Sequence, residues 1–395
     1  FADLTRELKS RHGLKTVLDV VCNHGSPSFS MPEDQPGYGE LYGAGGELLA
    51  DHQNLEPKDL DPDNPLHQWF HRERDLAELS NLDDTNPAVL DYMVGAYLKW
   101  IDQGAAALRI DTIRHMPHAY WKQFADRIRE VDPSVFMFGE RFQFDAEKLA
   151  EHMKLENGDI SVLDFPGQAA MTQVFQNPDS SFADLTSYLH LADGVYDNPY
   201  KLAIFYDNHD MARMDATETG FINANNWLFT SRGFPVVYYG SEMAFMSGAA
   251  EHKGNRNYFG PERIAEAREG RIYRQLKRIA QVRRDSPALQ RGLQVNLQFE
   301  GHQAAFLRVL QQDGVNQTAL VLLNKGPETE TFQLAEMVDA GNWRNATGGG
   351  TVRVNGDLEI SVPAYGATVL TRDLPVQDEA LKTALREAAG GIPRI

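Results

Sequence analysis

The chain has 395 residues, 42% of them hydrophobic, which is more than one typical domain core requires. It carries 38 lysine and arginine residues against 56 aspartate and glutamate residues, a net charge of −18 that argues against nucleic-acid phosphates and anionic lipid as partners. The apolar runs are short and broken by glycine or charge, so none of them is expected to span a membrane.

Helix-like and strand-like segments alternate up to about residue 291. Residues 1–13 form a helical pattern that Gly13 can end. The strand-like runs are apolar almost throughout, which is typical of strands buried on both faces, and their alternation with helices predicts an α/β fold around a parallel sheet. The single cysteine, Cys22, cannot form an internal disulfide and is expected to be buried after the first run. The six runs begin at Thr16, Ala106, Val135, Ile160, Leu202 and Pro235.

Two of the predicted helices have well-defined sequence patterns. Asn86 is a candidate N-cap, Pro87 suits the first helical position, and Gly104 can terminate the helix that follows. A second helix is predicted from about Arg271 to Leu289, where the apolar residues recur at helical spacing.

Two regions depart from the alternation. Residues 25–80 are rich in Gly, Pro, Asp and Asn and are too long for an ordinary strand-to-helix loop, so they are expected to form a functional insertion. From about Gly292, short alternating strands predict an antiparallel β-sandwich, with Asn355-Gly356 as a hairpin turn. Residues 378–391 form an amphipathic helical pattern and are expected to be a surface tail.

Three carboxylates stand at or just after the ends of strand-like runs: Asp111 in LRIDTIRH, Glu140 in FMFGE and Asp210 in FYDNHD. A parallel barrel delivers its strand ends to one rim, so these groups can converge there. Cleavage of a glycosidic bond requires a carboxylate nucleophile and a carboxylic acid.

The surroundings of two of these groups suit those roles. Arg109 precedes Asp111 by two residues, on the same side of a strand, and can hold that carboxylate ionised and oriented. Glu140 lies among phenylalanines, and apolar surroundings favour the neutral, proton-donating form of a carboxyl group. Gly139, just before it, is expected to let a ligand approach closely.

Each motif alone also has a structural interpretation. An isolated R-x-D is more often a helix cap beside a salt-bridging arginine, and a strand-end glutamate beside Arg141 is more often half of an ion pair. Asn-His-Asp at 208–210 is usually a turn. Their ordered occurrence in one chain favours the catalytic interpretation.

Together with Asn23 and His24 in VLDVVCNH, these segments resemble the four short sequence regions of the α-amylase family, glycoside hydrolase family 13. The resemblance implies a (β/α)8 TIM barrel with an inserted domain B and a C-terminal β-sandwich. In that family the DVVxNH region lies at the third strand, so the first two strands are expected to be missing from this chain. The implied domains are the incomplete barrel at 1–24 and 81–291, domain B at 25–80, the β-sandwich at 292–373 and a helical tail at 374–395.

The resemblance also implies roles for individual residues. Asp111 would be the nucleophile, Glu140 the acid/base, and Asp210 a carboxylate that favours the charged transition state. His24 would contact the primary hydroxyl of the sugar ring that is cleaved. The remaining substrate-binding residues by this matching are Arg109, Arg114, His115, Phe142, Asn208 and His209.

A calcium ion joining domain B to the barrel is a further implication. Its ligands would be Asn23, the carbonyl of His115 and Glu78 in DLAELS, where the family has an aspartate. Oxygen ligands suit calcium, and the longer glutamate is expected to weaken the site. The alternative is a direct contact of Glu78 with Asn23 or with a nearby cationic side chain.

Hydrolysis and sugar transfer use the same catalytic residues. The segments LTSRGFPVVYYGSE and HMPHAYWKQF resemble cyclodextrin glucanotransferases in particular. Arg74 stands where those enzymes have an aromatic around which the glucan winds, Arg141 replaces a tryptophan, and Arg114 replaces an acceptor-site lysine. We therefore expect a retaining α-amylase-like hydrolase of α-1,4-glucans, with the glucanotransferase as the alternative.

A non-catalytic binding or assembly protein of the same fold is disfavoured, because all three carboxylates are present. A binding-only fragment is a further alternative if the first two strands are absent. The aromatics Trp69 and Trp121 are candidates for stacking on sugars, although packing in the core is the commoner role for each. An α-glucan is the expected partner, and the family resemblance implies an extracellular or periplasmic location.

Overall fold

The computed structural model describes residues 1–27 and 37–389. Residues 28–36 of the expected domain B and the end of the expected tail therefore lie outside the described residues. The chain divides into two compact units, one of Phe1–Phe142 with Lys148–Leu163 and one of Gln143–Glu147 with Asp164–Ile395. Within the described residues no helix combines the length and the apolar character needed to cross a membrane.

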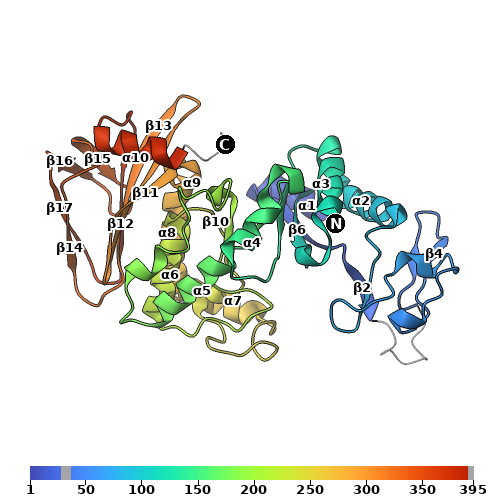
Figure 1. The fold of residues 1–395 in the computed structure, drawn as a ribbon. Coiled ribbons are helices and arrows are strands. Elements are labelled where there is room, and N and C mark those ends of the chain that lie inside the picture. Colours follow the sequence, from blue (N-terminus) through green and yellow to red (C-terminus); the bar gives the residue numbers. More distant parts are fainter. Residues whose placement is uncertain (28–36, 390–395) are drawn as a thin grey trace. The chain divides into compact units, whose positions relative to one another are not determined.

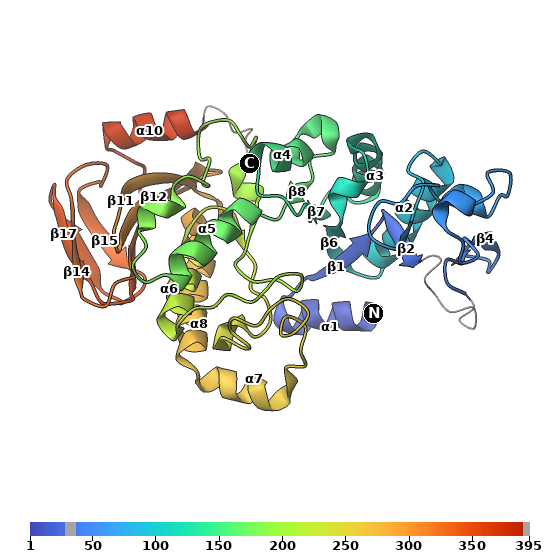
Figure 2. The ribbon, with the colours of Figure 1, turned by 60° about the horizontal axis from the view of Figure 1, so that its bottom comes forward.

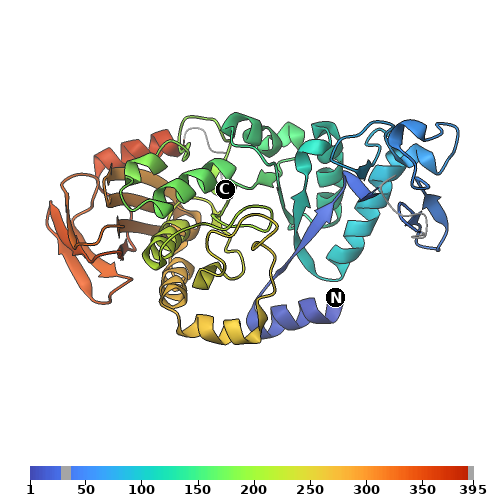
Figure 3. The same cartoon turned by 90° about the horizontal axis from the view of Figure 1, so that it is seen from below.

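The first unit is built on a four-stranded parallel sheet in the order β1-β6-β7-β8. The register pairs Val21 with Asp111 and Ile110 with Gly139, so the carboxyl ends of the first three strands lie side by side. Helix α1 leads into β1, both dark blue in Figure 3. The bounds are β1 Thr16–Val21, β6 Ala105–Asp111, β7 Phe136–Gly139, β8 Ser161–Val162, α1 Ala2–His12, α2 Pro87–Asp102 and α3 His118–Val131.

Helices α2 and α3 pack on this sheet through a shared apolar core, in which Val89 and Phe124 meet Leu108. The start of α2 is as predicted, because the side chain of Asn86 accepts a hydrogen bond from the Ala88 N–H and Pro87 is the first helical residue. Cys22 is fully buried, as expected.

Short irregular elements fill the region that follows β1. Strand β2 pairs with β5, and β3 pairs with β4, both antiparallel. The bounds are β2 His24–Pro27, β3 Leu41–Tyr42, β4 Leu48–Ala50 and β5 Leu79–Asn81, and the 3-10 helices of this unit are η1 Pro57–Asp59, η2 His67–Trp69, η3 Ile113–His115, η4 Glu151–Met153 and η5 Leu155–Asn157.

In the second unit two further parallel strands pair with each other, β9 and β10. Each of the six predicted parallel runs therefore contains a strand, but in the described residues they form a four-stranded and a two-stranded sheet, and the barrel is not closed. The bounds are β9 Ala203–Ile204, β10 Phe234–Pro235, α4 Ala146–Ala150, α5 Phe165–Gln176, α6 Glu218–Thr230, α7 Gly260–Glu269, α8 Arg271–Arg284, α9 Pro287–Arg291, η6 Phe182–Leu185, η7 Pro199–Lys201 and η8 Ser241–Met243.

The helix predicted from Arg271 to Leu289 is in fact two helices. Helix α8 ends at Arg284, and Ser286 caps α9 by accepting a hydrogen bond from the Leu289 N–H. Pro287 lacks the N–H that would continue α8, so the chain has to start a new helix there.

The C-terminal part is an antiparallel β-sandwich, as predicted. A six-stranded sheet in the order β11-β12-β13-β18-β15-β16 faces the two-stranded sheet of β14 and β17. Helices α6 and α8 lie on the other side of the large sheet (Figure 1). The strands are β11 Leu293–Glu300, β12 Gln303–Gln312, β13 Val315–Asn324, β14 Glu330–Leu334, β15 Gly341–Asn345, β16 Thr351–Val354, β17 Leu358–Val362 and β18 Ala367–Arg372.

Strands β12 and β13 are buried on both faces, and alternate residues serve different cores. Leu307 and Leu320 pack into the sandwich, whereas Phe306 and Val321 pack against the helices. The six-stranded sheet is thus shared between two hydrophobic cores.

Two expectations about this region were wrong. Asn355-Gly356 forms a turn with an isolated bridge from Asn355 to Asp357, but β16 pairs with β15 and β17 pairs with β14, so the turn joins two sheets instead of closing a hairpin. The predicted surface tail is helix α10, Glu379–Ala389, which lies over the sandwich (Figure 2) and buries Leu381 in its core.

Candidate functional site

Arg109, in strand β6, gathers three carboxylates of the first unit. Its Nη1 donates hydrogen bonds to Asp111 Oδ1 at 2.6 Å and to Asp19 Oδ1 at 3.0 Å. Its Nη2 lies 3.6 Å from Glu140 Oε2, within ion-pair distance but beyond a hydrogen bond. The parallel register sets Asp19 of β1 directly opposite Arg109, which explains why this strand residue reaches the guanidinium.

Asp111 and Glu140 lie next to each other at neighbouring strand ends. A carboxylate oxygen of Asp111 and one of Glu140 are within 4.8 Å of each other. The side chain of Glu140 is only 10% exposed and that of Asp111 22%, so both are largely shielded while Asp111 keeps access to solvent. Such a pair can supply a nucleophile and a proton donor to one bond.

The backbone around this pair is tightly constrained. Glu140 donates its N–H to the Ile110 carbonyl at 2.7 Å and accepts a hydrogen bond from the Ile113 N–H at 3.1 Å. A side chain at Gly139 would lie 2.5 Å from Ile113 Cδ1, so this glycine makes room for a core residue, contrary to the expectation that it admits a ligand. Thr112, directly after Asp111, has a φ of 51°, a strained conformation of the kind found at active sites.

His24 and Asn23 form a second polar group in the same unit. Asn23 is 1% exposed, and its Nδ2 is within 3.3 Å of three oxygens, those of Asp75 Oδ2, Asn81 Oδ1 and the His115 carbonyl. His115 Nδ1 also contacts Asp75 Oδ2, at 2.8 Å. Burial lowers the pKa of His24 and outweighs the negative charge of Asp111, which acts in the opposite direction, so the neutral form is favoured.

In the second unit, Asp210 follows strand β9 in a polar turn. The Asp210 N–H is bonded to Asn208 Oδ1 at 2.9 Å, His209 Nε2 lies 2.9 Å from Asp210 Oδ2, and Arg256 donates to Asp210 Oδ1. The bond from His209, followed by the charge of Arg256, lowers the pKa of Asp210. Asp210 is therefore a stable anion.

The neighbouring Asp207 differs from Asp210 in its burial and in the direction of its pKa shift. Asp207 is 3% exposed and accepts hydrogen bonds from the Met214 N–H and from Ser241 Oγ, both at 2.7 Å. Burial raises its pKa. Of the two aspartates in FYDNHD, Asp207 supports the loop and Asp210 is the one a ligand can reach.

Residues 1–285 match the α-amylase catalytic domain. The chain belongs to the α-amylase family. Family membership agrees with the four sequence regions and with the strand-end position of Asp111 and Glu140 in the structure.

Two cyclomaltodextrin glucanotransferases illustrate the curated relatives. The enzyme of Geobacillus stearothermophilus is 28% identical over 408 residues, which cover 94% of this chain and 54% of that protein. The enzyme of Thermoanaerobacterium thermosulfurigenes is 27% identical over 372 residues, covering 90% of this chain and 49% of that protein. The chain thus spans about half the length of the curated relatives it matches.

Solved structures of the family share the fold. A cyclomaltodextrin glucanotransferase with a three-domain ABC distribution is 26% identical with a TM-score of 0.74, over 94% of this chain and 78% of that chain. The α-amylase of Geobacillus thermoleovorans, complexed with acarbose, is 24% identical with a TM-score of 0.74, over 94% of this chain and 79% of that chain.

The family implies a calcium ion, and the contacts of Asn23 fit an oxygen-binding cation. An amide nitrogen carries two hydrogens, whereas three oxygens surround this one. The amide oxygen and nitrogen are interchangeable in assignment, and with the oxygen turned inward these atoms form an all-oxygen set. Asp75 supplies the carboxylate here, whereas Glu78 is exposed and makes no hydrogen bond or ion pair with another described residue.

The other residues singled out in the sequence have different environments. Arg74 pairs with Glu56 Oε2 at 3.0 Å, and Arg114 is exposed. Phe142 is 48% exposed, which suits a stacking surface. Trp121 is completely buried and donates to the Ile113 carbonyl, and Trp69 is 9% exposed, so both belong to the core.

Arg141, next to Glu140, is bound by the segment after it. Its Nη1 donates to the Lys148 carbonyl at 2.7 Å and lies 3.3 Å from Glu151 Oε2 and 3.2 Å from His152 Nε2. Its side chain is 17% exposed. The arginine therefore ties the chain after Glu140 to the start of η4.

Three residues of these polar groups were not predicted from the sequence: Asp19, Asp75 and Arg256. A charge inside the apolar run TVLDVV was a usable signal for Asp19. Asp75 stands three residues before Glu78 in the same motif, and the sequence offered both carboxylates. For Arg256, 46 residues beyond Asp210, we find no local signal.

Proposed function

We propose that this protein is a retaining glycoside hydrolase that cleaves α-1,4-glucosidic bonds in starch or maltodextrins. The single observation that carries the proposal is the closeness of Asp111 and Glu140, of which one carboxylate oxygen each lies within 4.8 Å of the other at neighbouring strand ends. Retaining enzymes hold their two carboxyl groups about 5 to 5.5 Å apart, whereas inverting enzymes need about 6.5 to 9.5 Å to admit a water molecule.

The proposed reaction has two displacement steps. Asp111 attacks the anomeric carbon and forms a glycosyl ester, while Glu140 gives its proton to the glycosidic oxygen, so the bond to the leaving sugar breaks. Glu140, now ionised, takes a proton from water as that water attacks the same carbon and releases Asp111. Arg109 orients the nucleophile through its 2.6 Å hydrogen bond.

The remaining roles follow the family matching. Asp210 would favour the positive charge that develops on the sugar ring, and its lowered pKa keeps it anionic in the pH range where such an enzyme works. His24, in its neutral form, and His209 would bind sugar hydroxyls. Arg114, His115, Phe142 and Asn208 would complete the substrate contacts.

Glucan transfer to a sugar acceptor is the second candidate, favoured by the glucanotransferases among the relatives. Hydrolysis is preferred because Arg74 is 51% exposed and charged at the position of the central aromatic. The charge keeps that region hydrated, and water is the acceptor in hydrolysis. An exposed aromatic ring at this position would instead offer a surface on which a sugar ring can stack.

A structural calcium ion belongs to the proposal. Asn23, the His115 carbonyl and a carboxylate from Asp75 or Glu78 would hold it, and it would fix the inserted region on the sheet of the first unit. The proposed domains are the barrel part at 1–24 and 81–291, domain B at 25–80, the sandwich at 292–373 and the tail at 374–395. Action outside the cytoplasm is likewise part of the proposal.

The test is product analysis on soluble starch with the full chain. We expect linear maltooligosaccharides whose new reducing ends first appear as the α-anomer in ¹H NMR. Cyclodextrins as the main early product would favour the transferase, and an initial β-anomer would contradict the retaining mechanism. An Asp111→Asn variant serves as the inactive control.

A further inference from the structure

Glu140, the proposed acid/base, has a hydrogen-bonded neighbour on each side in the chain. Gly139, before it, accepts a hydrogen bond from the Leu163 N–H at 3.0 Å, just after β8. Arg141, after it, places its Nη1 3.2 Å from His152 Nε2, in the segment that leads into β8. The two contacts enclose Glu140 in a ring within the first unit, because the chain between His152 and Leu163 connects them. Movement at either contact can therefore shift the Glu140 carboxyl group.

His152 is the buried ionisable partner of Arg141. It is 1% exposed, whereas the side chain of Glu151, which also contacts Arg141, is 46% exposed. The His152 carbonyl accepts a hydrogen bond from the Ile160 N–H at 3.0 Å, and the imidazole packs on that of His118, with ring centroids 4.5 Å apart. His152 is thus held both through its backbone and through its ring, and it offers Arg141 a firmer anchor than a carboxylate in solvent.

The contact with Arg141 requires a neutral His152. A guanidinium only donates hydrogen bonds, so His152 Nε2 has to accept one and the ring proton belongs on Nδ1. Burial, followed by the charges of His118 and Arg141, lowers the pKa of His152 to about 3. His152 Nδ1 has no hydrogen-bond partner in the described part of the chain, so the contact through Nε2 is the one that orients the ring.

We infer that His152 is a positioning residue for Glu140: it accepts a hydrogen bond from Arg141 and thereby fixes the carboxyl group that protonates the glycosidic oxygen. The inference rests on the proposed function, in which Glu140 is the acid. Proton transfer requires the two heavy atoms to lie within hydrogen-bond reach, and a displacement of about 1 Å can cost about 100-fold in rate. A leaving group that needs no proton is insensitive to such a displacement.

The test compares two substrates that differ in their need for an acid. The leaving oxygen in soluble starch must be protonated, whereas α-maltotriosyl fluoride releases fluoride without a proton. His152→Leu removes the acceptor and should lower kcat on starch about tenfold, with KM and the kcat of fluoride release within about twofold of the parent. His152→Gln supplies a side-chain oxygen that can accept from Arg141, and it should keep kcat on starch within about threefold of the parent.

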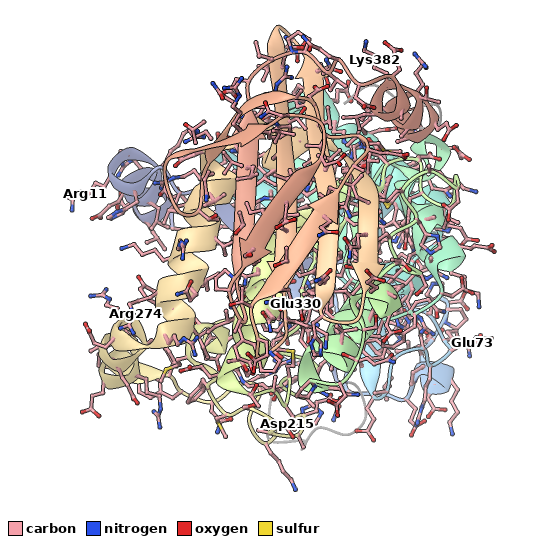
Figure 4. The ribbon with its side chains drawn as sticks, turned by 90° about the vertical axis from the view of Figure 1, so that its left-hand side faces the viewer. Arg11, Glu73, Asp215, Arg274, Glu330 and Lys382 are labelled. Atoms are coloured by element: carbon pink, nitrogen blue, oxygen red, sulfur yellow. The ribbon has the colours of Figure 1, made fainter. Side chains whose placement is uncertain are left out.

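Arg141→Gln removes the other half of the same contact and gives the answer if the buried leucine prevents folding, which the Tm of each variant reports. It should lower kcat on starch and spare fluoride release, as His152→Leu does. Arg11→Gln is the matched control, because Arg11 extends from α1 (Figure 4) and its side chain is 71% exposed. Both activities of this control should stay within about twofold of the parent.

The outcomes separate this inference from the proposed function. Equal losses on the two substrates, or an unchanged kcat on starch, in the folded His152→Leu and Arg141→Gln variants would overturn the inference and leave the proposed function standing. A parent protein that turns over neither substrate would defeat the proposed function, and this inference with it.

Discussion

Two arginines, one in each compact unit, hold carboxylates in different ways. Arg232 and Asp164 are both completely buried, and Arg232 Nη1 donates to Asp164 at 2.9 Å. Arg232 also donates through Nε and Nη2 to the Leu189 and Tyr188 carbonyls, so each of its three nitrogens has a partner. Arg109 is 9% exposed and faces three carboxylates, yet its Nη2 has no hydrogen-bond partner among the described residues.

The difference separates a structural ion pair from the proposed catalytic site. In the pair of Arg232 and Asp164 every nitrogen of the guanidinium and both carboxylate oxygens have a hydrogen-bond partner inside the protein, which offsets the cost of burying two charges. Around Arg109, hydrogen-bonding capacity is left over, and Asp111 stays 22% exposed. Groups that must bind a substrate and change charge cannot be fully satisfied beforehand.

The largest effect is expected from Asp111→Asn. The amide keeps the shape but cannot attack the anomeric carbon, so kcat/KM on soluble starch should fall at least about 10⁴-fold, equivalent to about 5.5 kcal/mol. The free energy of unfolding should change by less than about 1 kcal/mol, and glucan binding should remain detectable. Turnover within tenfold of the parent would mean that another group is the nucleophile.

The second prediction concerns Asp164→Asn in the fully buried pair of Arg232 and Asp164. It leaves the buried Arg232 charge uncompensated and should lower the free energy of unfolding by about 3 to 5 kcal/mol in urea denaturation. The control is Asp91→Asn, because Asp91 and Arg127 are 66% and 41% exposed and such a pair is worth less than about 1 kcal/mol. If the two variants lost the same free energy of unfolding, the buried and the exposed ion pair would not differ in their contribution to stability.

Calcium removal should have an intermediate effect. A metal ion whose free concentration is one hundred times its Kd stabilises the folded state by about 2.7 kcal/mol. A chelator should therefore lower the Tm of the parent protein. Asp75→Asn should abolish this response and Glu78→Gln should preserve it, since Asp75 is the carboxylate that contacts Asn23. A chelator that changes neither Tm nor activity would exclude a structural metal.

The smallest effect is expected from Arg256→Gln. The pKa of Asp210 is lowered by the hydrogen bond from His209 and then by Arg256, so removing the arginine should raise it. A lowered carboxyl pKa stabilises the fold above the ordinary value of 3.8, and this stabilisation is lost as the pH falls through the lowered value. In the variant the folded-state pKa lies closer to 3.8, so the stabilisation above that pH should be smaller and its loss should be complete at a higher pH.

A ¹³C NMR titration of the Asp210 carboxyl group measures this shift directly. His209→Gln removes the hydrogen bond that lowers the pKa of Asp210 most and should raise this pKa further than Arg256→Gln does. An unchanged titration in both variants would mean that neither side chain stabilises the anion.

Local signals allowed part of this structure to be predicted. Asn86 and Pro87 specify the start of α2 because capping and a fixed φ act within one turn. Asp111 and Glu140 were identified because apolar runs end at them, and a parallel sheet sets neighbouring strand ends side by side.

Features that depend on contacts between distant parts of the chain could not be predicted. The Asn355-Gly356 turn is a local feature, but which strands β16 and β17 pair with depends on the packing of two sheets. Asp75, and not Glu78, contacts Asn23. Ala77, between the two carboxylates, has a φ of 49°, a conformation that nothing in the sequence requires.

The six-stranded sheet that serves two cores has a consequence for truncation. Removing the chain from residue 292 onward would take Phe306 and Val321 away from helices α6 and α8 and expose the apolar face those helices share with it. The C-terminal region is thus a covering layer for the second unit and cannot be detached as an independent module. Its amide hydrogens should exchange in the same cooperative opening as those of α6 and α8.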